Sequence, residues 1–224
     1  MAIAKPSGLV VHRSAQAPER DTCMRRLRGQ LGRWVYPVHR LDRGTSGALL
    51  FALDPATARE VTAAFARRQV RKTYLAVVRG FAPEAGEINH PIAGADAGRP
   101  APALTCFTCL ACVELPHAVG RYASARYSLV RAEPLTGREH QVRRHLRHVD
   151  HPVVGDVTHG DSRHNRFFRT RFGLHRLLLH ALQLELPHPD DGRPLVLHAP
   201  PPPEMQRLFA ELGWAAALSA AQAA

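Results

Sequence analysis

The stretch Val38–Gly47 reads VHRLDRGTSG and leads directly into the apolar run Gly47–Leu53. It places one carboxylate, Asp42, between the guanidinium groups of Arg40 and Arg43. If Asp42 lies in a cleft, these positive charges favour its ionised form, and a positioned carboxylate can act as a nucleophile. On the charge pattern alone, however, a surface ion pair or a turn position is the stronger interpretation of Asp42.

The segments next to this stretch predict short helices and strands. Asp54 and Pro55 are typical of a helix N-cap and of a first helical residue. The alternating run Val70–Val78 predicts a strand with Lys72 and Tyr74 on one face. The patterns together predict helices over Cys23–Leu31, closed by Gly32, and over Pro55–Gln69, and strands over Gly47–Leu53 and Val70–Val78.

The second half of the chain mixes several strands with few helices, which favours an α+β fold. We expect one domain over residues 1–212, followed by an Ala-rich tail, residues 213–224, that frays. We predict a surface connection over Gly86–Pro102, strands over Leu104–Leu115, Tyr127–Ala132 and Leu174–Leu186, helices over Arg138–Val149, Asp161–Gly173 and Glu204–Leu212, and a hairpin-like turn over Pro187–Pro194.

The composition favours a polyanionic partner. The 224 residues carry a formal charge of +11, and only Lys5 and Lys72 among the 30 Lys and Arg residues are lysines. Arginine pairs bidentately with phosphate and stacks on bases, so we expect nucleic acid. A GC-rich coding bias would explain the ratio of Arg to Lys, but not the positive excess.

No run of apolar residues is long enough to cross a membrane, and the first residues lack the apolar run of a signal peptide. We therefore expect a cytoplasmic protein without a membrane partner, and a monomer by default. Cys106, Cys109 and Cys112 have a spacing that can hold a metal, but no fourth ligand is evident nearby, and free cysteines on a strand are the favoured interpretation. His145, His148 and His151 lie among arginines, which would repel a metal cation, so we expect RNA contact or a surface position for them.

The segment His39–Gly47 resembles the HRLDxxTSG signature of the RluA family of pseudouridine synthases. Other segments resemble further motifs of this family in the same order along the chain, so the resemblance runs from Lys5 to about His198. Lys5–His12 is similar to the family's KPxGLxVH segment, Lys72–Ala76 to its KxYLA strand, Gly137–Arg143 to its GRxHQxR turn and helix, and His151–Asp156 to its HPIxGD segment.

The resemblance implies the α+β pseudouridine synthase catalytic fold. That fold has a mixed, mainly antiparallel sheet with flanking helices and a central RNA-binding cleft. We expect no S4-like domain, because the chain begins almost at Lys5-Pro6. For the same reason, we expect one of two things. Either the sheet lacks the edge strand that usually precedes this segment, or the first residue has been assigned downstream of the true start.

The resemblance also implies the chemistry. Asp42 matches the family's nucleophilic aspartate, which breaks the glycosidic bond of uridine so that the base reattaches through C5, without a cofactor or a metal. Tyr74 matches an active-site tyrosine that stacks on uracil and transfers protons; a core tyrosine is the alternative. Arg143 matches an arginine that pairs with the aspartate, and Arg40 one that fills the space of a flipped base.

Further segments resemble a branch of the family that modifies uridine 65 in the T stem of certain tRNAs. The rivals are a ribosomal RNA synthase of the same family, a non-catalytic RNA chaperone and, more remotely, a metal-binding redox protein. For each arginine of the helices over Arg138–Val149 and Asp161–Gly173, a solvated position on a charged face is as strong an interpretation as contact with a phosphate. The residues that we expect to contact RNA, besides Arg40, are Arg43, Lys72, Arg138, His140, Arg144, Arg163 and Arg166.

Overall fold

The computed structural model describes residues 1–13, 21–94 and 99–223. They divide into two compact units. The first unit comprises Met1–Lys72 and Ala181–Pro200, and the second comprises Thr73–His180 and Pro201–Ala224. The chain passes from one unit to the other within two strands and again after Pro200, so neither unit is one continuous stretch of sequence.

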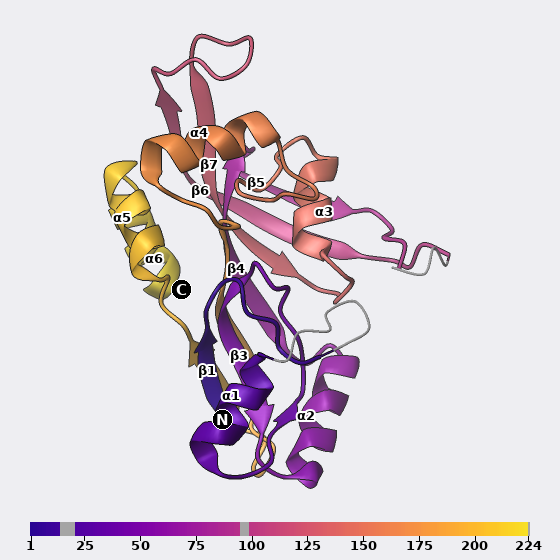
Figure 1. Cartoon of the computed structure of the whole chain (residues 1–224). Coiled ribbons are helices and arrows are strands. Elements are labelled where there is room, and N and C mark those ends of the chain that lie inside the picture. Colours follow the sequence, from indigo (N-terminus) through magenta and orange to yellow (C-terminus); the bar gives the residue numbers. More distant parts are fainter. Residues whose placement is uncertain (14–20, 95–98, 224) are drawn as a thin grey trace. The chain divides into compact units, whose positions relative to one another are not determined.

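The first unit is built on antiparallel pairs. Its elements are β1 (Ala2–Lys5), α1 (Cys23–Leu31), β2 (Tyr36–Pro37), β3 (Ser46–Ala52), α2 (Pro55–Ala66), the part of β8 (Leu179–Pro187) from Ala181 onward, and β9 (Pro194–His198) (Figure 1). The strand order is β1-β3-β8. Strands β1 and β2 both pair with β3, and β9 pairs with β8 across the predicted hairpin turn, all antiparallel.

Local signals determine where the helices of this unit begin and end. The Asp54 carboxylate accepts the N–H of Thr57 at 2.9 Å and caps α2 as predicted. Helix α2 ends at Ala66, three residues earlier than expected, because Arg68 adopts a left-handed conformation with φ 59°. Helix α1 has the predicted bounds and ends at Gly32, which also has a left-handed conformation.

Every residue of β3 is buried, as its continuous apolar sequence predicts. The strand is entered through Gly47, which has φ 119°. A Cβ atom at this position would lie 2.1 Å from the carbonyl oxygen of Ala181 on β8. Only glycine therefore permits this close approach of the two backbones.

The second unit carries a four-stranded antiparallel sheet with helices. It contains β4 (Arg71–Arg79) from Thr73 onward, β5 (Ala85–Asn89), β6 (Leu104–Leu115), β7 (Ala125–Pro134), α3 (Gln141–His148), α4 (Ser162–Phe172), α5 (Pro203–Glu211) and α6 (Ala215–Ala223). The strand order is β4-β7-β6-β5. The α+β prediction is confirmed. None of the helices in the described residues is long and apolar enough to cross a membrane.

Helix α3 is fastened to the sheet of this unit by its first residue. The Gln141 amide donates to the carbonyl of Leu104 at 2.9 Å and accepts the N–H of Arg138 at 3.0 Å. Leu146 is fully buried in the core beneath the helix. His145 is also fully buried and hydrogen-bonds Thr105 on β6, so its predicted surface position is wrong: two polar partners from distant segments satisfy the ring.

Further segments differ from the sequence predictions. Strand β8 begins at Leu179 rather than Leu174, and α3 begins at Gln141 rather than Arg138. The residues before Lys5-Pro6 do form an edge strand, β1, because they pair with β3. The predicted connection Gly86–Pro102 contains most of β5, although residues 95–98 lie outside the described part. The tail expected to fray forms α6, which contacts β6 and α5, and the preceding Trp214 is buried beside Phe209.

Candidate active site

The loop between β2 and β3 carries Asp42 with its flanking arginines. Asp42 is partly exposed, and Arg40 and Arg43 are exposed. The carbonyl of Asp42 accepts the N–H of Thr45 at 3.1 Å, which closes a turn. Leu41 and Thr45 are buried on either side of it. The loop therefore presents a carboxylate at the surface from a backbone that is anchored on both sides.

One anchor of this loop is the ammonium group of Lys5. This residue is only 1% exposed, at the end of β1. Its Nζ atom donates to the carbonyls of Pro6 at 2.9 Å, Leu9 at 2.6 Å and Arg43 at 3.1 Å. The three carbonyls use the full donor capacity of the ammonium group, so burial of the charge is compensated.

Two further bonds join the Asp42 loop to the segment that follows Lys5. The hydroxyl of Ser7 donates to the carbonyl of Gly44 at 2.7 Å, and the N–H of Gly8 donates to the carbonyl of Arg43 at 2.8 Å. Gly8 has φ 87°, a conformation that favours glycine. The turn after Asp42 is thus fixed by a segment that lies more than thirty residues away in the sequence.

His39, at the start of the signature, has a structural role. Its Nε2 atom accepts the N–H of Leu50 at 2.9 Å, and its ring stacks on Phe65 with centroids 4.8 Å apart. Burial, followed by the positive charge of Lys72, lowers the pKa of His39 to about 4. The ring is therefore neutral at pH 7 and supports β3 at Leu50.

The two candidate residues of β4 belong to different units. Lys72 lies in the first unit and is half-buried, and burial followed by the charge of Arg68 lowers its pKa to about 8. Tyr74 lies in the second unit, opposite Ala132 of β7, and packs its partly buried ring against the core of that unit. Both are built into the sheet rather than projecting freely into solvent.

Arg143 on α3 forms a buried ion pair within the second unit. Its Nε atom donates to Oδ2 of Asp156 at 2.6 Å, and its Nη2 atom donates to Oδ1 at 2.8 Å. Both side chains are almost fully buried. This bidentate geometry fixes the plane of the guanidinium group and leaves its Nη1 edge directed away from Asp156.

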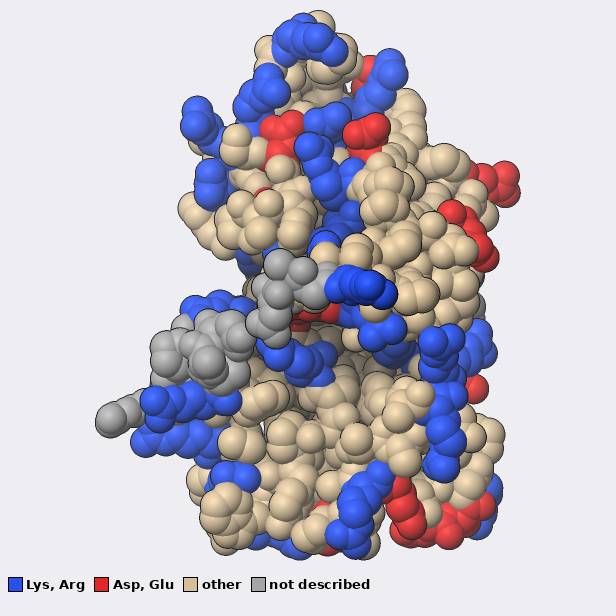
Figure 2. All heavy atoms as spheres, turned by 90° about the vertical axis from the view of Figure 1, so that its right-hand side faces the viewer, with Lys and Arg blue, Asp and Glu red and all other residues tan. Residues whose placement is uncertain are grey.

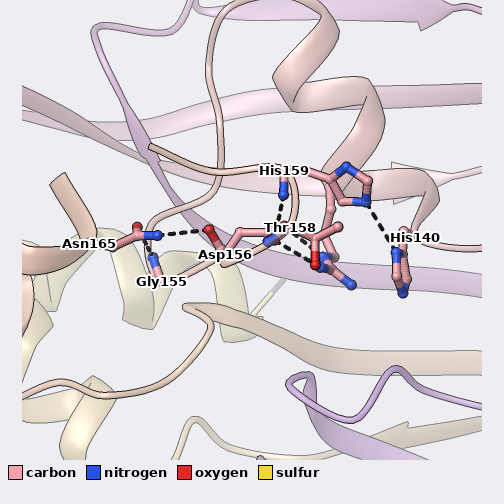
Figure 3. A network of polar contacts seen from close by, with 7 residues as sticks. His140, Gly155, Asp156, Thr158, His159 and Asn165 are labelled. Atoms are coloured by element: carbon pink, nitrogen blue, oxygen red, sulfur yellow. Dashed lines mark hydrogen bonds and ion pairs between the residues drawn. The ribbon is translucent and has the colours of Figure 1, made fainter. Parts of the chain in front are cut away.

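Asp156 is itself held by the loop that follows it. Its Oδ1 atom also accepts the N–H groups of Thr158 and His159, each at 2.9 Å, as Figure 3 shows. Its backbone carbonyl accepts a bond from the Asn165 amide at 2.7 Å. Burial alone would raise the pKa of Asp156, but the bonds from Arg143 and from the backbone outweigh it and hold the pKa below its usual value.

Two glycines allow the backbone to fold tightly around this carboxylate. A Cβ atom on Gly155 would lie 1.9 Å from the carbonyl oxygen of Arg176, and Gly155 has φ 80°. A Cβ atom on Gly160 would lie 2.2 Å from the carbonyl oxygen of Asp156. The segment before α4 is therefore packed so closely that no larger residue fits at either position.

The start of α3 places three candidate RNA contacts near one another along the chain. His140 has a left-handed conformation, and its Nδ1 atom lies 3.1 Å from Nε2 of His159 (Figure 3). The guanidinium of Arg144 donates to the carbonyl of Ala93 at 2.7 Å. Arg138 is exposed, and its Nε atom donates to the carbonyl of Pro102 at 3.3 Å.

Helix α4 exposes the two remaining candidates, Arg163 and Arg166. Asp161 caps the helix by accepting the N–H of Arg163, and it also forms an ion pair with Arg79 at 2.8 Å. Lys and Arg side chains are spread over much of the face in Figure 2, with fewer Asp and Glu side chains among them. This surface suits a polyanionic ligand.

A model of the RNA pseudouridylate synthase family matches residues 1–148. The chain belongs to this family. The tRNA pseudouridine synthase C of Vibrio cholerae serotype O1 is 45% identical over 226 residues, which cover 96% of this chain and 92% of that protein. The tRNA pseudouridine synthase C of Yersinia pestis is 44% identical over 225 residues, which cover 96% and 88%, respectively.

Solved structures agree with this assignment. The human RNA Pseudouridylate Synthase Domain Containing 4 has a TM-score of 0.72 at 26% identity, and the match covers 95% of this chain and 89% of that one. The human RNA Pseudouridylate Synthase Domain Containing 1 has a TM-score of 0.67 at 30% identity, with coverage of 90% and 86%. The protein is therefore an enzyme that converts uridine in RNA to pseudouridine.

The structure adds two residues to the candidate site of this pseudouridine synthase. Lys5 and Asp156 lie in segments that resemble family motifs, but their side chains carried no predicted role. Lys5 fixes the loop that bears Asp42, and Asp156 fixes Arg143. In the described residues, no group of three or more His, Cys, Asp and Glu side chains is arranged to hold a metal ion.

Replacement of Lys5 tests the anchor of the loop. Lys5→Met removes the ammonium that donates to the carbonyls of Pro6, Leu9 and Arg43, of which Arg43 keeps the Gly8 N–H, so we expect the free energy of unfolding to fall by about 2 kcal/mol. Because the Asp42 loop loses its anchor, we also expect kcat for pseudouridine formation to fall about 100-fold. Ser7→Ala removes a single bond and serves as the milder control. Wild-type turnover of Lys5→Met would contradict the anchoring role.

Replacement of Asp156 tests the buried ion pair. Asp156→Asn leaves the Arg143 guanidinium buried without its counter-charge, so we expect chemical denaturation to show a loss of about 3 kcal/mol. Asp161→Asn is the matched control, because that carboxylate pairs with a partly exposed arginine and asparagine also caps helices; there we expect a loss of about 1 kcal/mol. Equal losses of unfolding free energy in the two variants would show that the buried ion pair stabilises the fold no more than the partly exposed one.

The neutral state of His39 predicts an acid-dependent loss of stability. Its pKa in the folded protein, about 4, lies below the ordinary value of 6.5, so the unfolded state binds the proton first and stability is lost as the pH falls from about 6.5 towards 4. His39→Gln keeps an acceptor for Leu50 but cannot titrate. Across this range we expect the wild type to lose about 2 kcal/mol more than the variant in urea unfolding. Parallel pH profiles would contradict this.

Proposed function

We propose that this enzyme isomerises uridine 65 in the T stem of certain tRNAs. The observation that carries the proposal is the 45% identity over 96% of the chain to a protein whose name specifies tRNA as the substrate. The formal charge of +11 and the exposed arginines fit a polyanionic substrate such as tRNA. We further propose that the enzyme acts as a monomer in the cytoplasm.

Asp42 is the nucleophile in this proposal. The reaction breaks the bond between C1′ and N1 of uridine, turns the uracil and forms a bond between C1′ and C5. C5 loses a hydrogen and N1 gains one, so the atoms balance without a second substrate or a cofactor. A carboxylate on an anchored turn supports this role, because the attacking group must stay in place while the base rotates.

Tyr74 and Arg143 assist the reaction. The ring of Tyr74 stacks on the uracil, and its hydroxyl takes part in proton transfer. From the match to the family motif, Arg143 is the arginine that pairs with the Asp42 carboxylate. The support for this pairing is the match of Arg143 to the family motif, together with the bidentate hold that fixes its orientation.

A paired uridine in a stem has to leave the helix before it can react. Base flipping costs a few kcal/mol of stacking and pairing, which contacts in the complex must offset. Arg40 is exposed and able to stack in the vacated space and hydrogen-bond at the same time. The remaining basic side chains bind backbone phosphates, namely Arg43, Lys72, Arg138, His140, Arg144, Arg163 and Arg166.

Pseudouridine mapping in cells tests the substrate. Total RNA from a strain that lacks the gene is compared by carbodiimide-stop primer extension with RNA from strains complemented with wild type, Asp42→Asn or Asp21→Asn. We expect one T-stem signal in tRNA to disappear, and to return with the wild type and with Asp21→Asn, whose carboxylate only pairs with Arg26 at the surface. Asp42→Asn should not restore the signal.

Other patterns of signals would contradict parts of the proposal. A ribosomal RNA signal that disappears instead would leave the enzyme class intact and remove the tRNA assignment. A signal restored by Asp42→Asn would exclude Asp42 as the nucleophile. If no signal changes while the purified protein binds tRNA, the chaperone interpretation gains support.

A further inference from the structure

Three cysteines lie along β6, and a β-bulge changes which of them share a face. Cys106 pairs with Glu133, Cys109 with Val130 and Cys112 with Ser128 on β7. The register shifts between Cys109 and Ala111, so one extra residue is inserted in β6 at this point.

The bulge brings two of the thiols together. In a regular strand, residues three positions apart point to opposite faces. The extra residue restores Cys109 and Cys112 to the same face, opposite two β7 residues that are two positions apart. Their sulfur atoms lie 3.4 Å apart. Cys106 precedes Cys109 by three residues with no bulge between them, so it points to the other face.

The two thiols have different surroundings. Cys112 is exposed, whereas Cys109 is partly buried and packs against the core of the second unit. Burial, followed by the hydrogen bond and the charge of Cys112, raises the pKa of Cys109 to about 11. Cys112 is therefore the thiol that a reagent in solution meets first, and Cys109 is the second thiol, held beside it.

A hydroxyl supports the position of this pair. The Ser128 Oγ atom lies 3.3 Å from the sulfur of Cys112. Ser128 is fully buried and also binds the turn after β4, accepting the N–H of Ala82 and donating to the carbonyl of Gly80, each at 2.9 Å. The well-anchored hydroxyl of Ser128 thus holds Cys112 on the side of the cysteine pair that faces β7.

We propose that Cys109 and Cys112 are a reversible modification site, a dithiol that closes to an intrachain disulfide when it meets a small disulfide of the glutathione class. A disulfide bond is about 2.05 Å long, so the two sulfur atoms need to approach by about 1.3 Å. The inference rests on β6 and β7 alone and does not depend on which RNA the enzyme modifies.

The exchange proceeds in two balanced steps. The Cys112 thiolate attacks one sulfur of the small disulfide and expels the first small thiolate, which leaves a mixed disulfide on Cys112. Cys109 then loses its proton, attacks the Cys112 sulfur and expels the second small thiolate. The protein loses two protons and two electrons, and the small disulfide is reduced to two thiols.

Mass spectrometry of the full-length protein tests the proposal. The reduced protein is incubated with oxidised glutathione, free thiols are alkylated under denaturing conditions, and peptides are analysed. We expect the loss of two alkylatable thiols per chain and a link between Cys109 and Cys112, while Cys23 and Cys106 remain alkylated. Reductant should restore both thiols.

Single substitutions make the outcome decisive. Cys106→Ser is the matched control on the same strand and should close the disulfide at the wild-type rate. Cys112→Ser should abolish the link, and Cys109→Ser should leave a stable glutathione adduct on Cys112. The proposal is overturned if the wild type retains glutathione on Cys112 without closing, if Cys106 takes part in the link, or if both thiols stay reduced.

Discussion

A buried lysine holds the part of this enzyme on which the proposed chemistry depends. The Asp42 loop is irregular, so its shape has to come from contacts with other segments. The backbone of Lys5 pairs opposite Gly47 at the end of the loop, while its ammonium reaches back to the carbonyl of Arg43. One residue of β1 therefore holds the loop at two points, and the short edge strand supports the loop of the proposed active site.

In the second unit, a buried charge of the opposite sign holds a candidate residue in place. Asp156 is buried, and its carboxylate is satisfied by the Arg143 guanidinium and by two backbone N–H groups. A half-satisfied group at this depth would be costly, whereas a complete network fixes the orientation of each member. The close-packed glycines Gly155 and Gly160 let the backbone supply those donors. In both units, a buried charge orients the residue that the family motif singles out.

The sequence predicted local structure well and buried charges poorly. The bounds of α1 and β6 agree with the prediction, because caps and alternation act over a few residues. Arg143 and His145, however, lie on a helix that reads as basic and solvated, and their partners Asp156 and Thr105 are 13 and 40 residues away. Such pairs form only in the folded chain, and for this reason the periodicity of the sequence cannot reveal them.

Tritium release measures the central claim, nucleophilic isomerisation by Asp42, most directly. Formation of the bond from C1′ to C5 displaces the hydrogen at C5, so tRNA transcribed with uridine tritiated at C5 releases tritium only when it is isomerised. The account predicts one equivalent of tritium per tRNA from the wild type and none from Asp42→Asn, which should still bind the tRNA. Release by Asp42→Asn at the wild-type rate, or no release by the wild type, would contradict it.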